Sequence, residues 1–303
     1  MAGDVITARQ QSGERIATKP SLLQSATLRR NIGRGFLYVI AISSSAIFMF
    51  PFVWTLLSSL KRSAELFRFP PTWFPESPQW QNYPQVFEIV SWGAWTWNSV
   101  LIATSATFGA VLTAALVGYS FARFRYPGRT ILFMITMSTM MLPVEVTLIP
   151  LYLGFAKIGW MDSYKPLIVP SFFGGGAFLI FLMRQFFMSI PIDLDEAARL
   201  DGAGYLRIFW QILMPLSVPV TATAAVLTFM GEWNSFLHPF IFLNTKAKFT
   251  LAVGIRYFQS VAVVTDDTEP KYHLLMAASV MMTLPIILMF FLAQRYLVQG
   301  IVM

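Results

Sequence analysis

Six long apolar stretches, separated by polar connections, follow one another along most of the chain. They cover residues 35–60, 97–122, 130–155, 166–187, 216–243 and 274–293. Crossing a hydrocarbon core of about 30 Å takes about 20 helical residues, and each stretch reaches this length. Because backbone polar groups cannot stay unpaired in lipid, each stretch is predicted to be a helix. The pattern predicts an all-α, polytopic membrane protein with six transmembrane helices.

The stretches divide the chain into a membrane domain and two flanking tails. We expect a polar N-terminal tail over residues 1–34, a six-helix domain over 35–298 and a short C-terminal tail over 299–303. The first apolar stretch is too long, and too far from Met1, for a cleaved signal peptide. The first 30 residues are polar and lack periodicity, so we expect them to be disordered.

Small residues recur at every fourth position of the second apolar stretch. They are Ala106, Ala110, Ala114, Gly118 and Ala122. On a helix, this spacing aligns them in one row, where another backbone can approach closely. We therefore predict that this helix packs tightly against a neighbour.

Composition excludes several classes of function. Hydrophobic residues make up 56% of the chain and charged residues 12%, whereas soluble domains carry about 25% charged residues. An ordinary soluble enzyme is therefore excluded. The chain has no cysteine and two histidines, which excludes disulfide scaffolds and Cys-ligated zinc and argues against any metal site.

Charge indicates the partner and the orientation. The chain has 22 basic and 15 acidic residues, and the basic ones are scattered between apolar runs instead of forming a patch. A lipid bilayer is therefore a better partner than nucleic acid. Lys and Arg are retained preferentially on the cytoplasmic side, and most of them lie there if the N-terminus is inside. We predict that both termini are cytoplasmic.

The connection between the fourth and fifth stretches, residues 189–219, has the pattern of a helix, a glycine turn and a second helix. Asp193 and Glu196 have the spacing of a capping box, in which two carboxylates bond the free N–H groups of a first turn. Gly202 and Gly204 permit the positive φ angles that end a helix. The apolar face of the second helix is predicted to comprise Tyr205, Phe209, Ile212 and Leu213, with Pro215 ending it.

The run Glu196-Ala-Ala-Arg-Leu-Asp-Gly-Ala-Gly204 resembles the "EAA" loop of permease subunits in binding-protein-dependent ATP-binding-cassette (ABC) importers. The match continues at Phe209, Ile212, Leu213, Pro215 and Pro219. Outside the loop, the pairs Asn98-Ser99, Trp233-Asn234 and Leu284-Pro285 are similar to carbohydrate-uptake permeases. The resemblance extends from about residue 35 to Val298, and the subfamily resembled most is the second permease subunit of maltose-type importers.

The resemblance implies a function and a set of partners. In that family the loop inserts into a groove of an ATPase subunit, so a coupling role is implied for this segment. The candidate coupling residues are Asp193, Glu196, Ala197, Ala198, Asp201, Gly202 and Gly204. The implied partners are a second homologous permease subunit, two ATPase subunits and an extracytoplasmic sugar-binding protein, in the plasma (inner) membrane of a prokaryote. A second interpretation is that the loop merely closes the cytoplasmic side as an interfacial helix pair.

Energy must come from those partners. The chain contains no Gly-x-x-x-x-Gly-Lys-Ser/Thr phosphate loop, so it is not expected to hydrolyse ATP, and ATP and Mg are expected on partner subunits. We expect a non-catalytic translocation subunit that binds no cofactor itself. Nor do its apolar stretches hold the series of Asp, Glu and His residues that proton-coupled carriers use as relays.

Four residues in the apolar stretches are candidates for a substrate path. Glu232, Trp233 and Asn234 supply a carboxylate, a flat apolar face and an amide, which suit a sugar. Glu145 lies between Pro143 and Pro150, two residues that disturb a helix. The alternative is that Glu232 and Asn234 bond neighbouring helices, that Trp233 packs and that Glu145 reaches water at the outer surface.

Other functions remain open at this point. The cargo of the importer could be glycerol phosphate, a polyamine or a peptide, although a phosphate ester would favour basic residues in the spans. A self-sufficient secondary transporter would transport under an ion gradient alone and would show inverted repeats, which the sequence lacks. A membrane-embedded enzyme would need paired carboxylates or a Ser/His constellation, and none is evident.

Overall fold

The computed structural model describes residues 22–264 and 270–302, and every regular element in those residues is a helix. The first elements are α1 (Leu22–Ser59), α2 (Ser63–Leu66), α3 (Asn82–Ile89), α4 (Trp92–Arg123), α5 (Arg129–Ser138), η1 (Thr139–Met141), α6 (Val144–Lys157), α7 (Lys165–Ile168) and η2 (Val169–Phe172). The remaining ones are α8 (Ala177–Ser189), α9 (Asp193–Leu200), α10 (Tyr205–Ile208), the π-helical turn η3 (Phe209–Leu213), α11 (Met214–Leu216), α12 (Val218–Trp233), α13 (Leu237–Phe242), η4 (Lys246–Lys248), α14 (Leu251–Val264) and α15 (Tyr272–Val302).

The chain divides into two units, residues 1–54 and residues 55–303. The first unit is the larger part of α1, which continues through Pro51 without a break. The predicted tail over residues 1–34 overlaps this helix from Leu22 onward, and its earlier part lies outside the described residues. At the other end α15 runs to Val302, so residues 299–302 are helical.

Four segments of the described chain are long and apolar enough to cross a membrane. They are Arg30–Ser59, Trp92–Arg123, Lys165–Ser189 and Tyr272–Arg295. Two further candidates are bent pairs, α5 with α6 at 98° and α10–α11 with α12 at 79°. The described residues therefore contain four to six candidate membrane spans, and there are six if each bent pair forms one span.

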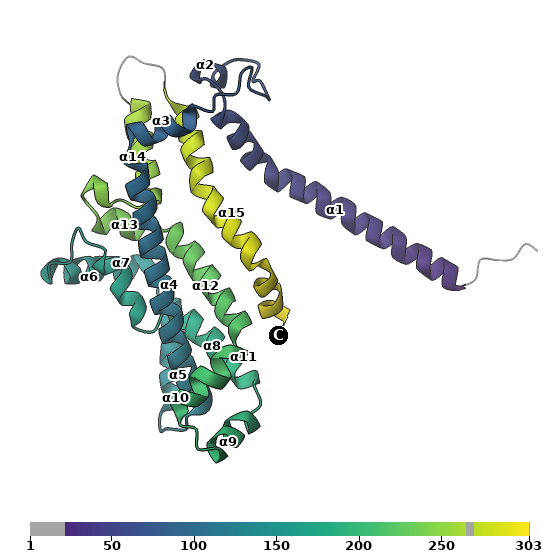
Figure 1. The fold of residues 1–303 in the computed structure, drawn as a ribbon, viewed down its shortest axis with the longest axis vertical. Coiled ribbons are helices and arrows are strands. Elements are labelled where there is room, and N and C mark those ends of the chain that lie inside the picture. The colour runs from purple at the N-terminus through teal and green to yellow at the C-terminus, as the bar shows by residue number, and fades with distance from the viewer. Residues whose placement is uncertain (1–21, 265–269, 303) are drawn as a thin grey trace, which may run out of the picture. The chain divides into compact units, whose positions relative to one another are not determined.

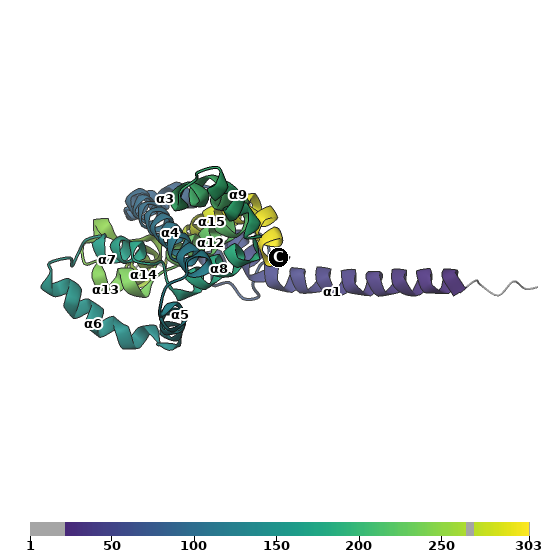
Figure 2. The ribbon, with the colours of Figure 1, turned by 90° about the horizontal axis from the view of Figure 1, so that it is seen from below.

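The third, fourth and fifth apolar stretches are each predicted to be a single helix, and this prediction is wrong. The fourth is interrupted between η2, which ends at Phe172, and α8, which begins at Ala177. In the third, Pro143 adopts an extended conformation between η1 and α6, and Figures 1 and 2 show α6 turning away from α5. Pro150 lies inside α6 without ending it. In the fifth, α12 ends at Trp233, and a separate helix, α13, follows.

The helix α4 forms the centre of the second unit, where it packs against α8 and α12 (Figure 1). Four of its five small residues, Ala106, Ala110, Ala114 and Gly118, lie in the interior, and the fifth, Ala122, is half-buried. A Cβ atom placed on Gly118 would lie 2.8 Å from the Cβ of Met183 in α8. The prediction of a close helix approach is confirmed.

The first turns of α4 hold the segment that follows α13. The Asn98 side-chain amide donates hydrogen bonds to the carbonyls of Ala247 and Phe249, at 2.8 and 3.0 Å. The indole N–H of Trp95 donates to the Lys246 carbonyl at 2.8 Å. The start of α4 and the start of α14 are thus fixed to each other.

A single carboxylate organises the loop between α6 and α7. Asp162 accepts hydrogen bonds from the backbone N–H groups of Asn244 and Thr245, from the Thr245 hydroxyl and from the Lys248 ammonium, at 2.6 to 3.0 Å. These bonds, led by those from Thr245, hold the pKa of Asp162 well below its usual range. The loop is therefore tied to the segment before α14 by an ionised group.

The Gly118 contact predicts a substitution effect. In an open helix, Gly→Ala is stabilising by about 1 kcal/mol. We expect Gly118→Ala instead to lower the free energy of unfolding by about 1–3 kcal/mol, because the added methyl overpacks the contact with α8. Gly93→Ala in the same helix, where a Cβ would meet nothing within 4 Å, is the matched control. Thermal unfolding in detergent measures both, and equal shifts would contradict the close approach.

The Asp162 cluster predicts a pH dependence. Since the pKa of Asp162 is lower in the folded chain than the unfolded value of about 3.9, its stabilising contribution is present at neutral pH and is lost on acidification below that value. We expect Asp162→Asn to lower the free energy of unfolding by about 1–3 kcal/mol at pH 7, with the difference shrinking towards pH 3. Unfolding at both pH values measures it, with Glu88→Gln at an exposed position of α3 as control. A deficit that does not depend on pH would refute the role of the charge.

Candidate coupling site

The connection between α8 and α12 folds as the predicted helix, turn and second helix. After α9, Gly202 takes a φ of +81°, a value that glycine adopts at little cost. The N–H of Ala203 donates to the Ala198 carbonyl at 2.9 Å, and that of Gly202 to the Arg199 carbonyl at 3.0 Å. These two bonds form a Schellman motif, which ends the helix with its last carbonyls satisfied. Gly204 has a φ of −76°, so Gly202 alone of the two takes a positive φ.

The predicted capping box at the start of α9 is wrong. The residue before the helix, Ile192, already has helical backbone angles, and no side chain caps the first turn. Asp193 therefore lies inside the helix. Only at the cap position could its carboxylate accept hydrogen bonds from the free backbone N–H groups of the first turn. Asp193, Asp195 and Glu196 all lie in the first turn, where negative charge is stabilised by the helix dipole.

The two faces of α9 differ in environment. Asp195 and Ala198, three residues apart, are buried against the bundle. Of the candidate coupling residues, Ala198 thus faces inward, whereas Asp193, Glu196, Ala197, Asp201, Gly202 and Gly204 are exposed. Leu200 is 89% exposed at the end of the helix.

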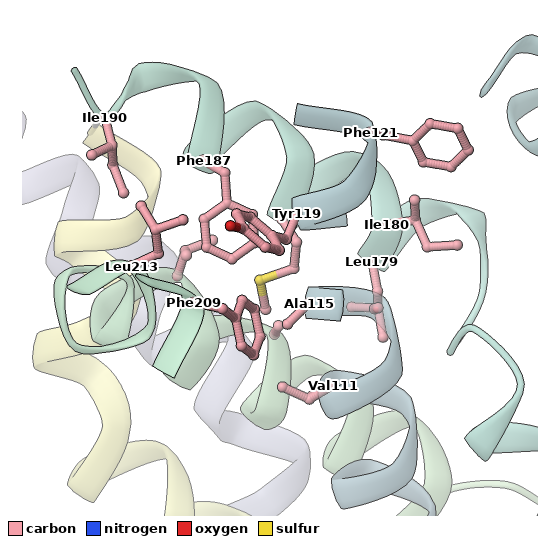
Figure 3. Packing of buried hydrophobic residues seen from close by; sticks show 14 of the residues in the cluster. Val111, Ala115, Tyr119, Phe121, Leu179, Ile180, Phe187, Ile190, Phe209 and Leu213 are labelled. Carbon is pink, nitrogen blue, oxygen red and sulfur yellow. The ribbon is translucent and has the colours of Figure 1, made fainter. Parts of the chain in front are cut away.

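The second half of the connection is bound to the bundle by aromatic packing. Figure 3 shows Phe187, Phe209 and Leu213 gathered around Tyr119 of α4. Of the predicted apolar face, Phe209 and Leu213 are fully buried, while Tyr205 is exposed with the Arg199 guanidinium 5.0 Å from its ring. The prediction that Pro215 ends this helix is wrong. Proline is tolerated in the first turn of a helix, and Pro215 lies in the first turn of α11, so the helical segment ends only at Ser217.

The last turns of α4 bond to residues on both sides of the coupling helix. The Arg123 guanidinium donates a 2.8 Å hydrogen bond from Nη2 to the carbonyl of Ile190, which follows α8. Its Nε lies 3.2 Å from Oδ2 of Asp195 in α9. The Tyr119 hydroxyl donates to the Tyr205 carbonyl at 3.2 Å. Sequence reasoning missed Arg123 and Asp195, because no local pattern relates two residues so far apart in the chain.

Burial dominates the electrostatics of Asp195. Its side chain is fully buried, and burial raises the pKa of Asp195 against the opposing influence of Arg123 and Arg199. Neither of its carboxylate oxygens accepts a hydrogen bond from the described residues. The contact with Arg123 is therefore the main compensation for a buried carboxylate.

The structure separates the four candidates for the substrate path. Trp233 is 1% exposed, its indole N–H donates to the Met282 carbonyl at 3.2 Å, and its ring stacks on Phe229. It therefore joins α12 to α15. Asn234 is exposed, although its amide donates to the Met230 carbonyl of its own helix, and Glu232 is half-buried. Glu145 is exposed in the first turn of α6, away from the other three along the chain.

The comparisons with known proteins decide the family. Residues 110–303 match the family model "Binding-protein-dependent transport system inner membrane component". The chain belongs to this family. The matched region includes the coupling segment and all of the bundle from the middle of α4 onward.

Relatives cover nearly the whole chain. The chain is 32% identical over 274 residues to the sn-glycerol-3-phosphate transport system permease protein UgpE of Yersinia enterocolitica, which covers 88% of this chain and 95% of that protein. It is 31% identical over 251 residues to the diacetylchitobiose uptake system permease protein NgcG of Streptomyces coelicolor, with 83% and 82% covered. Both are similar in length as well as in sequence.

A solved structure has the same fold. The crystal structure of a bacterial ABC transporter involved in the import of the acidic polysaccharide alginate contains a chain that matches with a TM-score of 0.75 and 22% identity. The match covers 92% of this chain and 99% of that one. This likeness shows the fold, and the family identifies the chain as a permease component of a binding-protein-dependent ABC importer, a non-catalytic subunit of the inner membrane.

Proposed function

We propose that this permease carries a sugar or polyol across the membrane and that α9 transmits to it the motion of an ATPase subunit. The observation that supports this most strongly is that α9 has one exposed face and one face packed on the bundle. The helix α9 presents Glu196, Ala197 and Asp201 outward, while its other face is buried and bonded to the bundle. A helix exposed on one side and fixed on the other moves with the partner that binds it and displaces the membrane helices.

The proposed assembly contains this chain, a second homologous permease subunit, two ATPase subunits and a sugar-binding protein outside the cell. ATP and Mg are bound by the ATPase subunits. Both termini lie in the cytoplasm, which places the basic residues after α4 and around α9 on the inner side. Closure of the ATPase pair around ATP carries α9 with it, and the spans then switch from inward-facing to outward-facing.

The relatives support the substrate class. One is named for sn-glycerol-3-phosphate, another for diacetylchitobiose, and the solved transporter imports alginate. Each of these compounds carries at least two hydroxyl groups on a carbon chain or sugar ring. We favour a neutral sugar or polyol, because the spans hold almost no basic residues besides Arg184 near the predicted inner end. The relative named for glycerol phosphate makes a phosphate ester the alternative cargo.

We propose that Glu232 and Asn234 line the substrate path. Trp233, between them in the sequence, holds this end of α12 against α15. We propose that Glu145 lies where the path meets the outer surface. A half-buried carboxylate within an apolar helix is retained at a cost of roughly 2.5 to 3.5 kcal/mol at the bilayer centre. Facing a water-filled path reduces that cost. The exposed amide of Asn234 follows at the end of the same helix.

The exposed face of α9 predicts a partner defect. We expect Ala197→Arg to weaken association with the ATPase subunit at least about tenfold, which corresponds to about 1.4 kcal/mol, because a long charged side chain cannot fit a groove that accepts alanine. Copurification and binding-protein-stimulated ATP hydrolysis measure the effect. Ala94→Arg, an exposed alanine at the opposite end of α4, is the control. Normal association of Ala197→Arg would refute the coupling assignment and favour a helix pair that only closes the bundle.

The path hypothesis predicts a transport defect without an assembly defect. We expect Glu232→Gln to reduce uptake at low substrate concentration about tenfold or more, since a transport step that loses about 1.4 kcal/mol slows by that factor. The amount of assembled complex should be unchanged. Glu88→Gln, on the exposed surface of α3, is the control. Unaltered uptake, or loss of assembly in proportion to uptake, would show that Glu232 is a helix contact.

A further inference from the structure

The end of α4 meets the coupling segment at a buried charge pair. Arg123 is the last residue of α4, and its side chain is 5% exposed. Asp195, in the first turn of α9, is fully buried, and Nε of Arg123 lies 3.2 Å from its Oδ2. The same guanidinium donates to the Ile190 carbonyl at 2.8 Å. One side chain therefore holds both the end of α8 and the start of α9.

The covalent connections of α9 pass through several breaks in regular helix. Before α9, the chain passes through Ile190 in an extended conformation and Pro191. After α9 come the turn at Gly202, the π-helical turn η3 and the 79° bend before α12. A displacement of α9 that travelled through these joints alone would be partly absorbed by changes in backbone angles. The pair with Arg123 bypasses all of them.

The helix α4 is also the element best placed to distribute such a displacement. It packs along α8 and α12, and its first turns bond to the segment before α14 at the other end of the bundle. A displacement of the end of α4 is therefore transmitted through close contacts to α8, α12 and the start of α14. The close approach at Gly118, about one and a half turns before Arg123, leaves α4 little freedom to move sideways against α8.

We propose that Arg123 and Asp195 are positioning residues for transport, which make α9 and α4 move as one body when the ATPase subunits close. The inference rests on the proposed coupling function of α9. Among the described residues the buried carboxylate accepts no hydrogen bond, and its Oδ2 lies 3.2 Å from Nε of Arg123, so the carboxylate moves with the guanidinium. Loss of either charge should leave α9 able to bind the ATPase but unable to move α4 with it.

The test uses the complete importer in lipid vesicles, with ATPase, second permease and binding protein present. The variants are Arg123→Gln, Asp195→Asn and the exchange Arg123→Asp with Asp195→Arg. Arg207→Gln is the control, because Arg207 is an exposed arginine of the same connection that bonds Gln211 instead of a carboxylate. Uptake and ATP hydrolysis are both normalised to the amount of assembled complex. We expect each single variant to lose uptake at least tenfold while retaining ATP hydrolysis, and the exchange to regain part of it.

A distance measurement separates positioning from simple stabilisation. The chain has no cysteine, so spin labels can be attached at Leu116→Cys in α4 and Leu194→Cys in α9, both exposed and neither a candidate coupling residue, with cysteine-free partners. We expect the distance between the labels to stay constant on ATP binding in the parent protein and to change in Arg123→Gln. An unchanged distance in the variant, or normal uptake per assembled complex, would overturn the proposal. If the parent assembly itself failed to couple ATP hydrolysis to uptake, the proposed function would fail instead.

Discussion

Close packing around α4 is the interaction on which the rest of the structure depends. Small side chains along one face allow α8 to approach until Gly118 leaves no room for a methyl group against Met183. That approach brings the end of α8 within reach of Arg123, and with it the first turn of α9. Aromatic side chains from α8 and η3 close around Tyr119 (Figure 3). The position of the coupling segment is thus a consequence of helix packing in the membrane domain.

Features that depend on neighbouring residues could be predicted from the sequence. The helical class, the buried row on α4 and the helix-turn-helix of residues 189–219 follow from apolar length, four-residue spacing and a glycine. In each case the residues that determine the local structure lie within that structure or directly beside it in the sequence. The resemblance of the run beginning at Glu196 also indicated the family that the comparisons show.

Features that depend on distant contacts could not be predicted. The sequence marks Pro143 as a residue that disturbs a helix, but it does not show that the chain turns by 98° there. Nor does it indicate the helical angles of Ile192 that displace Asp193 from the cap. Asp162 binds residues more than 80 positions away, and Arg123 meets Asp195 across two helices. Trp233 was a candidate for sugar stacking, yet its indole is buried and bonds Met282 of α15. A single sequence carries no signal for which of these partners meet.

The account rests on the claim that a separate ATPase drives this membrane domain through its exposed helix. The most direct measurement reconstitutes the two permease subunits in vesicles with and without the ATPase subunits, with sugar-loaded binding protein present on the extracytoplasmic side. The account predicts sugar accumulation that requires both the ATPase and ATP. Accumulation through the permeases alone, driven by an ion gradient, would contradict it.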